Sequence, residues 1–246
     1  MADSADGLGT PPPPTAAAVS SASTHQDRIF RSAGIVSIAV ALSRVTGLLR
    51  EVVLARLFGA SAAFDAFLLG FRIPNLTRDL FAEGALSSAF VPAFTATLSK
   101  EGKEAAIRLA TLVATALLLI VGGLPLSGME FRPGLVNIFA TGWTEYPEKY
   151  ELAIRMTRIM FPFLVLVALA AQAMGVLNAL NQFGVPAVAS AFFNLGSLAF
   201  GLALGFIFGP ALGITPIEGM AYGVVLGGAL QLFWQVPSLL KSGFRF

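Results

Sequence analysis

A series of long apolar segments is the feature that most limits what this chain can fold into. Of its 246 residues, 56% are hydrophobic and only 12% are charged, about half the charged fraction of a typical soluble domain. A segment that enters a bilayer must satisfy its backbone hydrogen bonds internally, which a helix does. The sequence therefore predicts an all-α fold, a polytopic bundle of membrane helices.

Composition argues against several kinds of chemistry. The chain has no cysteine and a single histidine, His25, so we expect no disulfide, no thiolate chemistry and no histidine-based metal centre. No nucleophile–base pair, phosphate loop or set of metal ligands stands out. We therefore expect no enzyme activity, no catalytic residue, no metal and no cofactor. The net charge of +2 comes from scattered residues without a basic cluster, so nucleic acid is not an expected partner.

Six segments are expected to cross the membrane, at about residues 31–57, 62–97, 105–126, 151–180, 186–209 and 217–240. A crossing helix needs about 20 residues, so the second segment is over-long and should be tilted, kinked at Pro74 or partly outside the membrane. Residues 1–27 are rich in Pro, Ala, Ser and Gly and predict a disordered cytoplasmic tail. Residues 28–246 then form one transmembrane lobe.

Basic residues at three places set the expected orientation. They precede the first segment, join the second to the third, and follow the sixth: Arg28, Arg31, Lys100, Lys103, Arg108, Lys241 and Arg245. Six crossings put all three places on one side, and short loops rich in Lys and Arg stay in the cytoplasm. Both ends of this multi-pass chain are therefore expected in the cytoplasm.

Charged residues inside the first segment gather on one face. At 100° per residue, a single arc of about 120° contains Ser43, Arg44, Gly47, Arg50 and Glu51. The other faces carry Val, Leu and Ala. Arg56 points away from the arc and is expected to reach the membrane surface.

The second segment carries a similar, less regular stripe of Asp65, Arg72, Asp79 and Glu83. An Arg, Lys or Asp at the centre of a membrane helix costs about 2.5–3.5 kcal/mol on insertion scales. Such groups must therefore pair with one another or face a wet cavity or a ligand. Pairing alone would satisfy them, but we favour a cavity, because a purely structural bundle could use apolar residues more cheaply. The guanidinium fork suits phosphate, although the acidic residues balance the arginines in number.

Uncharged residues in the later segments have a simpler reading. Gln172, Asn178, Asn181 and Asn194 are expected to be interhelical hydrogen-bond partners or helix caps, with substrate contact as the less favoured alternative. Asn194 is retained among the candidate site residues. The Gly and Ala content of the third, fifth and sixth segments favours close helix packing.

Three blocks of sequence resemble the MurJ (MviN) family of lipid II flippases. They are SRVTGLLREVVLARLFGA from residue 43, FDAFLLGFRIPNLTRDLFAEGALSSAFVPAF from residue 64 and VLNALNQFGVPA from residue 176. The match covers about residues 30–246. The resemblance implies the fold of the multidrug/oligosaccharidyl-lipid/polysaccharide exporters, in which two helical lobes enclose a central cationic cavity. Alternating access then carries the lipid-linked peptidoglycan precursor across the bacterial inner membrane.

The resemblance also assigns site residues. The arginines of the family motifs SRxxGxxR and PNLxR line the cavity, and here they correspond to Arg44, Arg50 and Arg78. The family's acidic positions correspond to Glu51, Asp65 and Glu83. Together with Ser43 and Asn194, these are the candidate substrate-binding residues. The implied partners are lipid II or a similar lipid-linked pyrophosphate, membrane lipids, and a second lobe or a second copy of the chain.

Two departures from the family pattern bear on this expectation. Asp79 stands where the family commonly has a second basic residue. Family members are about twice as long, so this chain resembles only the N-terminal lobe and is expected to be a fragment or to assemble with another lobe. The alternatives are a flippase for another polyprenyl-pyrophosphate-linked oligosaccharide, a multidrug antiporter, whose motifs match poorly, and a non-transporting membrane scaffold subunit.

Overall fold

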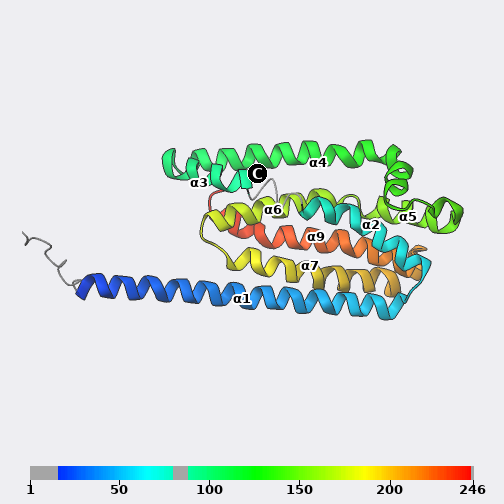
Figure 1. Ribbon diagram of the computed structural model, residues 1–246, viewed down its shortest axis with the longest axis horizontal. Coiled ribbons are helices and arrows are strands. Elements are labelled where there is room, and N and C mark those ends of the chain that lie inside the picture. The colour runs from blue at the N-terminus through cyan, green and yellow to red at the C-terminus, as the bar shows by residue number, and fades with distance from the viewer. Residues whose placement is uncertain (1–15, 80–87, 245–246) are drawn as a thin grey trace, which may run out of the picture.

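The computed structural model describes residues 16–79 and 88–244, and these form an elongated bundle of helices (Figure 1). The first half of the chain contributes α1 (Ala16–Phe58), α2 (Ala62–Asp79), α3 (Val91–Lys100), α4 (Lys103–Phe139) and the 3-10 turn η2 (Trp143–Glu145). The second half contributes α5 (Pro147–Met160), α6 (Phe163–Ala179), α7 (Gly184–Leu202), the π-helical turn η3 (Ala203–Ile207), α8 (Gly209–Leu212) and α9 (Pro216–Lys241).

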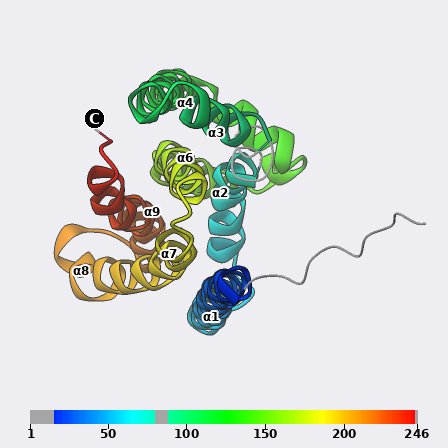
Figure 2. The same ribbon diagram turned by 90° about the vertical axis from the view of Figure 1, so that its left-hand side faces the viewer.

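Viewed end-on, the long helices α1 and α4 lie at opposite edges of the bundle, and α6 lies between them (Figure 2). Helices α7 and α9 pack side by side on one flank, while α2 packs on α5. Helix α1 contains 43 residues, about 64 Å at 1.5 Å per residue, and is therefore longer than the hydrocarbon core is thick. It begins at Ala16, so residues 16–27 are helical where composition predicted a disordered tail.

Several described helices are long and apolar enough to cross a membrane. Three qualify by themselves, Lys103–Gly123, Gly184–Ile207 and Pro216–Lys241, and α5 with α6 makes a fourth if this pair, bent by 40°, is one broken span. These helices confirm the all-helical membrane class. The count of six stays a prediction, because α1 and α2, the charged helices, are not among them.

The expected segments differ from the helices mainly at their ends. The predicted second segment is two helices, α2 and α3, and residues 80–87 between them lie outside the described residues. The fourth breaks between Met160 and Phe163, at Pro162, whose ring cannot donate a backbone hydrogen bond. The third extends to Phe139, well past its expected end.

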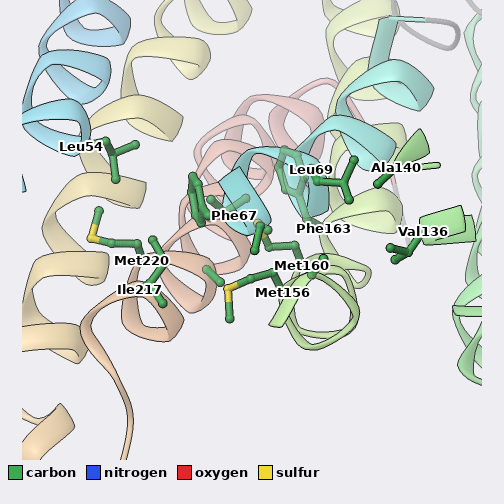
Figure 3. Packing of buried hydrophobic residues seen from close by; sticks show 14 of the residues in the cluster. Leu54, Phe67, Leu69, Val136, Ala140, Met156, Met160, Phe163, Ile217 and Met220 are labelled. Atoms are coloured by element: carbon green, nitrogen blue, oxygen red, sulfur yellow. The ribbon is translucent and has the colours of Figure 1, made fainter. Parts of the chain in front are cut away.

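Two apolar clusters hold the bundle together. The larger lies where α1, α2, α4, α5, α6, α7 and α9 meet. Figure 3 shows several of its side chains close together: Leu54, Phe67, Met156, Met160, Phe163 and Met220. The second joins α3, α4, α6 and the end of α9 through Phe90, Phe94, Ala110, Leu177 and Leu239. Helix α6 contributes to both clusters and also lies between α1 and α4 (Figure 2), so it is at the centre of the fold.

Glycines bring α7 and α9 into unusually close contact. A Cβ on Gly223 would lie 2.6 Å from the Gly201 nitrogen, and a Cβ on Gly227 would lie 2.7 Å from the Ser197 nitrogen. The expected close packing of the fifth and sixth segments is therefore confirmed. In the third segment the contact is made by alanines, since Ala106 and Ala110 are fully buried, whereas a Cβ on Gly123 would meet nothing within 4 Å.

Candidate functional site

A cleft of about 530 Å³ opens between α1, α6, α7 and α9. Its apolar walls come mainly from α6 and α7. Its polar lining consists of Ser43, Arg44, Ser190, Asn194, Gln231 and Gln235. The cleft therefore combines one cation with several uncharged hydrogen-bonding groups.

Asn194 of α7 fixes the position of α1 at the cleft. Its Nδ2 donates to the Ser43 carbonyl oxygen at 3.0 Å and lies 3.5 Å from the Thr46 hydroxyl. The close approach of the Asn194 side chain to α1 depends on Gly47, where an added Cβ would lie 3.2 Å from the Asn194 Nδ2. The expected interhelical role of Asn194 is confirmed, and the residue also lines the cleft beside Arg44.

Arg44 projects into this cleft and is exposed. Within residues 16–79 and 88–244 its guanidinium makes no hydrogen bond or ion pair. Mutual pairing of Arg44 with Glu51, which would have satisfied both charges without a ligand, is thus not what the described residues show. A guanidinium at the edge of a polar cleft is suited to an anionic group with several acceptor oxygens.

Arg50 lies in a different environment. Its guanidinium carbon is 5.2 Å from the centroid of the Phe71 ring and 5.3 Å from that of Phe193, and these two rings are stacked 6.5 Å apart. Such contacts attract a cation to the ring faces. Together with Glu51, Arg50 lines a smaller pocket of about 140 Å³ against α2.

The structure therefore divides the predicted polar arc between two sites. Ser43 and Arg44 line the cleft, whereas Arg50 and Glu51 line the smaller pocket. Phe193 contacts both, because its ring lines the cleft and also lies 5.3 Å from the Arg50 guanidinium carbon.

Asp65 lies away from both arginines. Its carboxylate pairs with Lys149 of α5 at 2.6 Å, and the same ammonium group lies 4.0 Å from the Trp143 ring centroid. Asp65, which matches an acidic position of the family, is therefore in an ion pair and does not line the cleft. Arg72 is exposed. The side chains of Arg78 and Asp79, and all of Glu83, lie outside the described residues.

Several polar residues of the bundle were not anticipated. Ser190, Gln231 and Gln235 line the cleft, and Arg155 of α5 bonds Glu218 of α9 at 3.1 Å. The i, i+4 spacing of the two glutamines in an apolar helix was the available signal. Gln172 was anticipated: its Nε2 donates to the Ala110 carbonyl oxygen at 2.6 Å, which confirms an interhelical hydrogen bond.

The family model described as lipid II flippase MurJ matches residues 54–246, most of the chain. The chain belongs to the MurJ family. The lipid II flippase MurJ of Burkholderia cenocepacia is 41% identical over 213 residues, and the probable lipid II flippase MurJ of Bdellovibrio bacteriovorus is 36% identical over 219.

These alignments cover 87% and 88% of this chain but only 40% and 41% of the two MurJ relatives. The chain thus spans about 40% of their length. A solved structure of a lipid II flippase MurJ in the inward closed conformation superposes with a TM-score of 0.70 at 29% identity, covering 86% of this chain and 43% of that one. The family and the fold of this lobe rest on independent sequence and structural likeness.

Proposed function

We propose that this chain forms the N-terminal lobe of a lipid II flippase and that the Arg44 cleft receives the pyrophosphate of the lipid-linked headgroup. The observation that carries the proposal is the exposed guanidinium of Arg44, held at a polar cleft within an apolar bundle of the MurJ family. An arginine at such a place is costly unless it faces water or a ligand. A pyrophosphate offers several acceptor oxygens to its fork of donors.

The position of the cleft supports entry of the headgroup from the cytoplasm. Its lining comes from the first two thirds of α7, residues 167–174 of α6, the second half of α9 and the middle of α1. The α7 and α9 residues lie towards the end of the bundle that carries the α6–α7 loop and the end of α9, the side that the distribution of Lys and Arg predicts to be cytoplasmic. We propose that the chain crosses the bacterial inner membrane and that both of its ends lie on the cytoplasmic side.

Translocation across the whole bilayer would need more than this lobe. The match to this chain spans about 40% of the length of its relative, and α1 presents a largely exposed apolar face that includes Ile38, Val45 and Leu48. We propose that a second lobe faces α1 and completes the cavity, and that alternating access occurs between the two. Lipid II is the substrate proposed here on the strength of the relatives' activity.

A chimera tests the proposal. In it, this chain replaces the 213 matching residues of the Burkholderia cenocepacia relative, and the chimera is expressed in cells depleted of their own flippase. The unsubstituted chimera should restore growth. Arg44→Gln should weaken binding of the anionic headgroup by about 10- to 100-fold, the range for a lost hydrogen bond to a charged group, and should fail to restore growth.

Arg56→Gln is the matched control, because Arg56 lies on the same helix in its last turn and lines neither pocket. It should restore growth fully. Equal rescue by Arg44→Gln and Arg56→Gln, at equal membrane abundance, would refute the role of the cleft. Arg50→Gln and Arg78→Gln extend the test to the two other motif arginines.

A further inference from the structure

Three uncharged residues of the cleft are given no role by the pyrophosphate site proposed at Arg44. Ser190 of α7 and Gln231 and Gln235 of α9 line the cavity together with Arg44. The two glutamines are four residues apart, so they lie on the same face of α9. Within the described part of the chain, neither the Ser190 hydroxyl nor the Gln231 side-chain amide makes a hydrogen bond. These groups give the cleft a neutral polar wall.

Gln235 is the most informative of the three. Its side chain is 1% exposed, and its Nε2 donates to the carbonyl oxygens of Ala170 and Gln231, both at 3.2 Å. Carbonyl oxygens only accept hydrogen bonds, so this contact pair determines which end of the amide is nitrogen. The Oε1 atom is then buried without a partner among the described residues. A buried acceptor without a donor is costly, which points to a ligand that brings a donor.

The chemistry of the wall narrows the kind of ligand. An amide oxygen requires an O–H or N–H donor, and a second amide and a hydroxyl nearby can both donate and accept. A metal cation is disfavoured, because Arg44 lies in the same cleft. The flat ring of Phe193 adds an apolar face to the lining. Neutral groups rich in hydroxyl and amide, such as sugars and their N-acyl substituents, meet all of these conditions.

Size is consistent with such a ligand. The cleft of about 530 Å³ has room for about a dozen waters or more at their liquid volume, which is more than a pyrophosphate alone fills. We propose that Ser190, Gln231 and Gln235 form a subsite for the neutral carbohydrate or amide part of the headgroup, next to the anionic part at Arg44. This subsite rests on the proposed function, and it would make the cleft selective for sugar-bearing lipids.

Binding of two lipids separates the two parts of the cleft. The chimera described above is placed in lipid nanodiscs, and its affinity is measured for lipid II and for undecaprenyl pyrophosphate, which lacks sugar and peptide. Gln231→Leu and Gln235→Leu should each weaken lipid II binding by about 3- to 10-fold, the effect of one lost neutral hydrogen bond. Neither should change the affinity for undecaprenyl pyrophosphate. Arg44→Gln should weaken the binding of both lipids.

Gln172→Leu is the control for a structural effect. Gln172 is also a buried amide that bonds a backbone carbonyl on another helix, but it does not line the cleft, so its loss should leave the ratio of the two affinities unchanged. Gln231→Leu removes no side-chain bond seen in the described residues, which guards against misfolding.

The outcomes distinguish the neutral subsite from the pyrophosphate site at Arg44. Glutamine variants that weaken both lipids equally, or neither, overturn the subsite, and so does an unsubstituted chimera that binds both lipids equally well. A chimera that responds to the glutamines but not to Arg44→Gln retains the subsite and removes the proposed pyrophosphate site. A chimera that binds neither lipid refutes the proposed function and the subsite with it.

Discussion

Replacing Gly223 of α9 by alanine should weaken the contact between α7 and α9 severely. The added Cβ would lie within 2.6 Å of Gly201 Cα and N, and closer still to the Ser197 carbonyl oxygen. All three are backbone atoms, so no side chain can rotate away and the two helices must separate. Overpacking of this kind typically costs 1–3 kcal/mol, and we expect about 3 kcal/mol here. On the scale for domains of this size, that lowers Tm by about 6–12 °C.

Trp234 provides the assay. It lies on α9 with its ring centroid 4.1 Å from that of Phe192 on α7, so its fluorescence reports on this interface. The chain has two tryptophans, and Trp143→Phe would leave Trp234 as the only one. Thermal unfolding in detergent, followed at Trp234, gives Tm for each variant.

Gly122→Ala in α4 is the matched control for this substitution. There the nearest atom to an added Cβ is 4.0 Å away, so it should leave Tm unchanged or raise it slightly, because alanine favours a helix over glycine. Equal Tm values for the Gly223 and Gly122 variants would refute the packing argument.

Two further predictions concern charged groups. Trifluorination of the Phe193 ring weakens its attraction for the Arg50 guanidinium at 5.3 Å, and should lower lipid II affinity in the chimera by about 2- to 10-fold. The same change at Phe163, which stacks on Phe193 at 5.2 Å, should have little effect. Equal losses of affinity at the two positions would argue against a role for the Arg50 cation. Lys149→Met removes the partner of Asp65, a pair whose side chains are 23% and 48% exposed, so Tm should fall by less than about 4 °C. That difference should shrink in 1 M salt, and a salt-independent loss would show that the pair is not acting through its charges.

The charged arc on the first helix was predictable because helical geometry relates Ser43, Arg44 and Arg50 without knowledge of the rest of the fold. Its division into two sites was not. That division involves Phe193, a residue of α7 far away in sequence, whose ring lines the cleft and also lies 5.3 Å from the Arg50 guanidinium carbon. No local sequence pattern predicts which phenylalanine of a membrane protein will contact an arginine of another helix.

Ion-pair and hydrogen-bond partners that come from distant helices could not be predicted from the sequence either. Asp65 was expected among the arginines, but Lys149, from the start of α5, is its partner. Gln231 and Gln235 do not stand out in the sequence, because a glutamine in an apolar helix commonly makes an ordinary interhelical hydrogen bond, as Gln172 does. The break at Pro162 was obscured for a related reason, since α5 and α6 read as one continuous apolar segment.

The interlocking of α7 and α9 limits how the cleft can change shape. With backbone against backbone at Gly223 and Gly227, these helices cannot slide past each other without first moving apart, so they should move as one rigid unit. That unit carries Asn194 and Gln235, so opening or closing of the cleft should come from α6 and from α1, with loss of the Asn194–Ser43 hydrogen bond. Spin labels on α7 and α9 should therefore keep one fixed separation in every state, while labels on α1 and α7 report the motion; several α7–α9 distances would contradict this view.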